Sequence, residues 1–317
     1  MKIFGWVLFA VLIVPTCARG QVEGTIGGRP AHRWIKSENG LLLFFNRREA
    51  RDAASSEVQV FGKHGEPVVS FALLPLVSGA ETVQTEDVSA VPGKRIAVYA
   101  AYAKADGSVA YVLLYFDFNG SLLRAFAVDP TRDIDALALD DSLNVWTVTA
   151  AGGQDPSRAP MVVEYSDTGS VVKQLLPRSE FPKDAKMTEQ SSQIGALAAG
   201  YNSGTFWFWL PASAELVTIR TSDSAVTRTP LSLPPPPSDG RSWPQTLSRE
   251  ASGDVVLSMG ETTEPHTVQY IWSQKTRTWS EFEPTSCQGD WLLGADGNQE
   301  IYVDLRGSNE VCAVRNQ

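Results

Sequence analysis

VLLYFDFNGSLLRAF, residues 112–126, consists of two apolar runs that flank the turn 117–120. Both runs are rich in aromatic and branched side chains, which favour β-strands. Asn119 and Gly120 tolerate the positive φ angles that tight hairpin turns demand. The segment therefore predicts a β-hairpin.

This hairpin recurs along the chain. Turn residues separate apolar runs in the same way at 62–65, 166–169, 222–224 and 274–276. A second hairpin precedes each of these hairpins, and its second strand is rich in aromatic and branched residues. These strands are LLLFF (41–45), IAVYA (96–100), VWTV (145–148), FWFWL (206–210), VVL (255–257) and IYV (301–303). We therefore expect about six modules of about 50 residues, each a four-stranded antiparallel meander. Because such a sheet buries its faces only against neighbours, the pattern predicts a propeller or a solenoid.

The last module favours the propeller. Residues 291–294, 301–304 and 311–314 supply three strands, and a fourth is missing. Residues 21–26 are a spare segment that would complete this sheet and close a ring without an open sheet edge. We therefore predict an all-β fold, a six-bladed β-propeller with four-stranded antiparallel blades, closed by an N-terminal strand that completes the last blade.

Two motifs carry a resemblance to a known family. Residues 115–126 (YFDFNGSLLRAF) and 134–146 resemble six-bladed β-propellers of the NHL/TolB-like kind. The resemblance covers about residues 30–317, and it implies the fold rather than an activity. The Trp-Asp dipeptide of WD40 repeats is absent, and the lone Gly152-Gly153 pair in a predicted loop argues against kelch repeats.

Residues 1–20 are predicted to be a signal peptide. Lys2 precedes an apolar run, 4–14, that is too short to span a membrane. Small residues at positions 18 and 20 predict cleavage before Gln21, so that residues 21–317 form one secreted or periplasmic propeller domain. An uncleaved anchor and a lipid on Cys17 are the alternatives.

Charge limits the partners that we expect. The formal net charge is −9, and it becomes −11 when Lys2 and Arg19 leave with the signal peptide. An acidic surface argues against nucleic acid and anionic membranes as partners. No stretch after the signal peptide is long and apolar enough to span a membrane. We expect a monomer with a protein or glycan partner.

Cys287 and Cys312 both fall in the last module. An even pair of cysteines in an exported chain predicts a disulfide, which would stabilise the fold by about 3 kcal/mol. Two buried free thiols are the alternative.

No catalytic motif is evident. His32, His64 and His266 do not have metal-ligand spacing, and we expect them to be structural or exposed. The sequence lacks a G-x-S-x-G nucleophile elbow, a glycine-rich phosphate loop and a dinucleotide-binding motif.

Topology nevertheless suggests a cation site. The first strand of each blade lines the central channel, and its leading residue should lie near the channel mouth. The residues concerned are Asp87, Asp133, Gln193, Gln245 and Asp290. Three carboxylates and two amides suit a hard cation such as Ca²⁺, with Asp87, Asp133 and Asp290 as its charged ligands. We prefer the interpretation that they are ordinary solvated residues, because acidic side chains are common in turns.

Long loops should share one face of the propeller. They are residues 46–56 and 150–160 within blades, and 177–193 and 234–245 between blades. We place Trp243 in the last of these loops as a contact residue. The leading hypothesis is a binding or interaction module that uses this face. The alternative is a metal-assisted hydrolase, resembling a lactonase or esterase, with a cation at the channel mouth.

Overall fold

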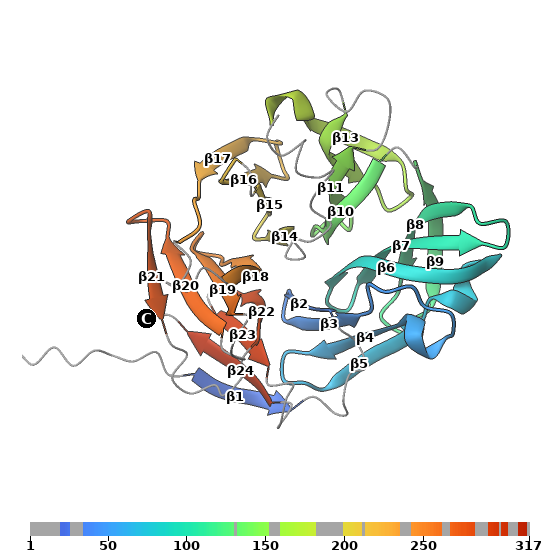
Figure 1. The fold of residues 1–317 in the computed structure, drawn as a ribbon, viewed down its shortest axis with the longest axis horizontal. Helices are drawn as coiled ribbons and strands as arrows, with labels where there is room; N and C mark the ends of the chain where they lie inside the picture. Colours follow the sequence, from blue (N-terminus) through green and yellow to red (C-terminus); the bar gives the residue numbers. More distant parts are fainter. Residues whose placement is uncertain are drawn as a thin grey trace, which may run out of the picture.

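The computed structural model describes residues 20–25, 34–129, 132–151, 159–181, 199–210, 213–234, 242–261, 267–282, 291–297, 299–303 and 310–315. These residues form six antiparallel sheets of four strands each, arranged as blades around a central axis (Figure 1). The predicted fold class is confirmed.

The blades are numbered in chain order. Blade 1 contains β2 (Trp34–Glu38), β3 (Leu41–Phe45), β4 (Glu57–Gly62) and β5 (Pro67–Ala72). Blade 2 contains β6 (Ala80–Val91), β7 (Arg95–Lys104), β8 (Val109–Phe116) and β9 (Leu122–Val128). Blade 3 contains β10 (Arg132–Leu139), β11 (Val145–Ala151), β12 (Pro160–Tyr165) and β13 (Val171–Pro177).

The second half of the ring repeats this order. Blade 4 contains β14 (Ala199–Asn202), β15 (Thr205–Leu210), β16 (Glu215–Arg220) and β17 (Val226–Pro230). Blade 5 contains β18 (Ser242–Arg249), β19 (Val255–Glu261), β20 (Thr267–Ser273) and β21 (Thr278–Phe282). Blade 6 contains β22 (Trp291–Asp296), β23 (Gln299–Val303), β24 (Glu310–Arg315) and β1 (Gly20–Thr25). Short 3₁₀ turns are η1 (Ala54–Ser56), η2 (Leu74–Leu76) and η3 (Arg178–Glu180).

The first and last strands of the ring belong to one sheet. β1 pairs antiparallel with β24, and the register places Gln21 opposite Ala313 and Val22 opposite Cys312. The outermost strand of blade 6 therefore comes from the other end of the chain, as predicted from the short last module. This pairing gives β24 a neighbour on both sides.

Six apolar clusters of the described residues hold the blades together, one between each pair of neighbours. The FWFWL strand shows how the strand period builds them. Phe206 and Phe208 pack toward blade 3, where Trp146 lies 5.8 Å from the Phe206 ring centroid. Trp207 and Trp209 point to the opposite side and pack toward blade 5.

Tight turns join the strand pairs at one end of the blades, which we call the tight-turn face. Several of these turns bond to the neighbouring blade: Asn39 Nδ2 donates to the Ala90 carbonyl at 2.9 Å, and Tyr201 Oη donates to Asp141 Oδ2 at 2.7 Å. Gly40 has φ 74°, and a Cβ there would lie 3.3 Å from Asp296 Oδ2 of blade 6. We call the opposite end the long-loop face.

Candidate functional site

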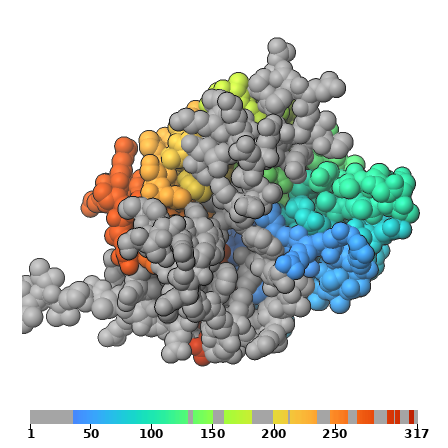
Figure 2. Space-filling view, viewed as in Figure 1, coloured from blue at the N-terminus to red at the C-terminus, as the bar shows by residue number. Residues whose placement is uncertain are grey.

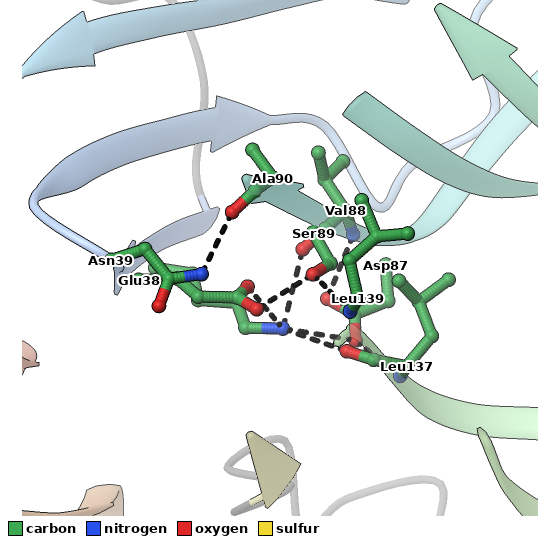
Figure 3. Close-up of polar contacts among 9 residues, drawn as sticks. Glu38, Asn39, Asp87, Val88, Ser89, Ala90, Leu137 and Leu139 are labelled. Carbon is green, nitrogen blue, oxygen red and sulfur yellow. Dashed lines mark hydrogen bonds and ion pairs between the residues drawn. The ribbon is translucent and has the colours of Figure 1, made fainter. Parts of the chain in front are cut away.

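A polar cluster lies where the inner strands of blades 1, 2 and 3 meet (Figure 3). Its side chains are Lys36 and Glu38 from β2, and Asp87 and Ser89 from β6. We call these four residues the channel cluster. Residues two apart on a strand share a face, so each strand presents both of its polar side chains to the same side.

Lys36 is the centre of the channel cluster. Its Nζ donates to the carbonyl oxygens of Leu137 at 3.0 Å and Val88 at 3.2 Å. It also lies 3.3 Å from Glu38 Oε2 and 3.5 Å from Asp87 Oδ2. The ammonium group thus has four oxygen partners from three blades.

The acidic and hydroxyl groups bind the backbone of blade 3. Leu137 N–H donates to Asp87 Oδ2 at 2.8 Å, and Leu139 N–H donates to Ser89 Oγ at 2.7 Å. Ser89 Oγ in turn donates to Glu38 Oε1 at 2.6 Å. Inner strands of neighbouring blades are not paired as a sheet, so these backbone groups need side-chain acceptors.

The cluster is strongly shielded from water. The Glu38 side chain is 4% exposed and that of Lys36 is 19% exposed. Burial lowers the pKa of Lys36, but the Asp87 and Glu38 carboxylates outweigh it and hold that pKa above its usual 10.5. Burial raises the pKa of Glu38 above its usual 4.5, and the Lys36 ammonium opposes this without cancelling it.

The chemistry of the channel cluster is that of an oxygen cage around an internal cation. Two carboxylates and two carbonyls surround the ammonium of Lys36. Asp87, which we expected at the channel mouth, lies well inside the twelve-residue strand β6, so its predicted position at the start of the strand is wrong. Two bulges lengthen β6 ahead of Asp87 and displace the residue along it.

The other predicted site residues are less fully described. The backbone places Asp133 near the start of β10, opposite Ala150, and Gln245 within β18. Gln193 and Asp290 lie outside the described residues. Among the part of the chain that the structure describes, no group of three or more His, Cys, Asp or Glu side chains is arranged to hold a metal ion.

Trp243 requires a correction. We expected it in a loop, but it belongs to β18, where it lies opposite Gly260. Pro244 follows it and favoured a loop assignment. The inner strand of a blade has a free edge, and β18 is bulged between Pro244 and Thr246, so the proline fits there.

Cys312 lies buried in β24, packed with Val256, Leu292 and Tyr302, and it has no disulfide partner among the described residues. Burial raises the pKa of this thiol. Cys287 lies outside the described residues, so the disulfide stays a prediction.

The loop 46–56 is the best-described long connection on the long-loop face. Ala50 pairs with Val83 of blade 2 through N–H···O=C bonds of 2.8 and 3.0 Å. Asn46 Nδ2 donates to the Ser55 carbonyl at 3.2 Å, and Ser55 N–H donates to Asp52 Oδ1 at 2.8 Å. The loop is thus bonded both to itself and across the boundary between two blades.

The anchored loop presents charged side chains to solvent. Arg48, Glu49, Arg51 and Asp52 are exposed, and the Arg51 side chain is 79% exposed while it pairs with Glu49 at 3.2 Å. In the space-filling view the blue surface of blade 1 adjoins the teal and green surface of blade 2 (Figure 2). Charged groups on a fixed backbone are a suitable contact surface.

Sequence reasoning missed Lys36, Glu38 and Ser89. The signal was present in the repeat: the contacts Lys36–Asp87 and Glu38–Ser89 each join residues 51 apart. The contacts from Asp87 and Ser89 to blade 3 each join residues 50 apart. Aligning the modules at this spacing would have brought these residues together.

Comparison with known proteins supports the fold alone. The sequence matches no protein-family profile and no curated protein. Among solved structures, a protein of Bacteroides fragilis described as exported is 11% identical with a TM-score of 0.52, and the match covers 95% of this chain and 94% of that one. The WD40 repeats of RRP9 are 8% identical with a TM-score of 0.52, over 94% of this chain and 100% of that one. Within the described residues, no helix is long and apolar enough to cross a membrane.

Proposed function

We propose that this protein is an exported β-propeller that binds a protein or glycan partner through its long-loop face. The resemblance of its motifs to NHL/TolB-like propellers and its similarity to an exported Bacteroides protein support this proposal. The predicted signal peptide, with cleavage before Gln21, and the predicted Cys287–Cys312 disulfide belong to the same proposal.

One observation carries the binding role. The loop 46–56 is fixed to blade 2 by the Ala50–Val83 pair, yet it leaves Arg48, Glu49 and Arg51 exposed. Fixing the loop before binding lowers the entropy cost of ordering these side chains on a partner.

The experiment compares the two faces of the ring. Protein produced with its natural leader is used to capture partners from the envelope or culture medium of its own host. The double variant R48E/R51E changes the long-loop face, and K63E/K94E makes the same charge change with exposed residues of the tight-turn face. We expect R48E/R51E to lose the captured partner and K63E/K94E to retain it.

Two results would count against the proposal. Equal capture of the partner by both double variants would show that the partner does not bind through the long-loop face. A retained leader, seen in the intact mass, would contradict the predicted cleavage before Gln21.

The metal-assisted hydrolase is the second candidate. Asp87 is one of its three predicted carboxylate ligands, and that side chain is already bound by Lys36 and Leu137. This observation favours the binding module.

A further inference from the structure

The turn between β8 and β9 contains the sequence Asn119-Gly120-Ser121. Asn-x-Ser/Thr is the acceptor sequence for N-linked glycans in exported proteins. No other asparagine of the chain is followed two residues later by Ser or Thr.

The geometry of this turn presents the acceptor to solvent. Asn119 and Ser121 are both exposed. Asp117 Oδ1 accepts the backbone N–H groups of Asn119 and Ser121, each at 2.9 Å. The turn is therefore held by the carboxylate of Asp117 and by backbone bonds between residues 117 and 121.

The other asparagines that the structure describes bond to groups outside their own turn. Asn39 donates its amide to Ala90, Asn46 to Ser55, Asn144 to Glu164 and Asn202 to Arg249. The Asn119 side chain instead bonds to Asp117 within its own exposed turn. The equivalent turns of blades 1 and 3 have His64 and Thr168 at this position, so the turn itself does not demand asparagine.

The surroundings of the turn leave room for a bulky group. Gly120, at φ 79°, sits against Val69 of blade 1, so the turn backs onto the neighbouring blade while Asn119 faces outward. Val68 and Leu123, on the outer strands beside the turn, are 39% and 46% exposed. An oligosaccharide at Asn119 would extend over this apolar rim, away from the long-loop face.

We propose that Asn119 is a site of N-linked glycosylation, an inference that rests on the proposed export of the chain. The donor is a lipid-pyrophosphate-linked oligosaccharide. Asn119 Nδ2 forms a bond to the anomeric carbon of the donor and loses one proton, and the bond from that carbon to the pyrophosphate oxygen breaks. The lipid pyrophosphate is the leaving group, and no oxidant or reductant takes part.

The test uses the folded protein, residues 21–317, with a purified oligosaccharide transferase and its lipid-linked donor. A peptide of residues 115–126 in the same reaction shows that the enzyme is active. We expect wild-type protein to gain the mass of one oligosaccharide, and peptide mapping to place it on residue 119. Asn119→Gln and Ser121→Ala should lose this gain completely, whereas Ser121→Thr should keep it.

The matched pair at residue 121 keeps the test informative, because both variants change the same exposed side chain. Wild-type protein that remains unmodified while the peptide is glycosylated would overturn the proposal. So would modification that persists in Ser121→Ala. The reaction with purified components does not require export. Its failure is therefore distinguishable from a failure of the proposed export.

Discussion

Two lysine–glutamate pairs lie within single blades, one in blade 1 and one in blade 3, and they differ in what surrounds the lysine. In the channel cluster, Lys36 lies between two carboxylates and is 19% exposed. At the outer strand of blade 3, Lys173 pairs with one carboxylate, that of Glu164, at 3.2 Å, donates to the Thr221 carbonyl at 3.4 Å and is 33% exposed. The first pair sits at the centre of the ring, and the second lies toward its outside, where water reaches it.

The partners of the two glutamates sharpen this difference. Glu164 also accepts a hydrogen bond from Asn144 Nδ2 at 2.7 Å, and Lys173 lies 5.3 Å from the centre of the Trp146 ring. Glu164 therefore keeps a donor if the lysine is removed. Glu38 would keep only the Ser89 hydroxyl, with the Asp87 charge close by. We therefore expect the lysine of blade 3 to be easier to replace than the lysine of the channel cluster.

Removing the central ammonium should have the largest effect. Lys36→Met leaves the buried carboxylates of Glu38 and Asp87 without a counter-ion, and breaking a buried charge pair in this way costs about 3–5 kcal/mol. Urea unfolding followed by tryptophan fluorescence measures the loss. Lys63→Met, at an exposed turn position, is the control and should be neutral. A loss for Lys36→Met below about 1 kcal/mol would mean that the channel cluster does not hold the ring together.

The loss should depend on pH in a defined direction. The folded-state pKa of Lys36 lies above its usual 10.5, so its stabilising effect is fully present below that value and is lost as pH rises through the raised pKa. The gap in unfolding free energy between wild type and Lys36→Met should therefore narrow at high pH.

The acid side of the profile should behave similarly. The pKa of Glu38 is raised in the folded state, so protonation favours folding as pH falls toward the usual 4.5. In Lys36→Met this gain in unfolding free energy should be larger than in wild type, because no ammonium opposes the protonation of Glu38. The difference in unfolding free energy between the two proteins should therefore narrow again at low pH. Unfolding free energies of both proteins from about pH 5 to about pH 11 give the profile. A constant gap would show that charge at Lys36 is not the cause.

Removing the outer lysine should cost less. Lys173→Met loses a partly exposed ion pair and a cation–π contact, while Glu164 keeps its bond from Asn144, so we expect a loss of about 1 kcal/mol. The same urea experiment applies, with the exposed Lys275→Met as control. An equal loss of unfolding free energy in Lys173→Met and Lys36→Met would mean that the place of the lysine in the ring does not determine the cost of removing it.

The contrast also explains what the sequence could predict. The hairpins, the alternation in Phe206 to Leu210 and the closing strand β1 follow from local turn residues and the period of two, so they were predicted correctly. The channel cluster depends on side chains that meet from three blades about 50 residues apart. No local pattern contains that contact. Asp87 was predicted as a site residue from a strand position that the structure does not give it, and its partner Lys36 was not predicted at all.

Divalent cations should have the smallest effect on the natural protein. Asp87 and Glu38 already neutralise Lys36, so Ca²⁺ would have to displace an ammonium that is tied to the same oxygen cage. We expect no rise in melting temperature of wild type with Ca²⁺ and no fall with EDTA.

The Lys36→Met variant reverses this expectation. Two carboxylates and the carbonyls of Val88 and Leu137 would then lack their cation, and oxygen ligands of this kind suit Ca²⁺. Ca²⁺ at about a hundred times its dissociation constant should restore about 2.7 kcal/mol of the stability that the variant lost. Sodium chloride at equal ionic strength is the control for screening. A rise in the melting temperature of wild type with Ca²⁺ would instead indicate a cation bound elsewhere. The variants Asp133→Ala and Asp290→Ala would then test the hydrolase alternative. Recovery confined to the variant would identify Lys36 as the cation around which the centre of this ring is built.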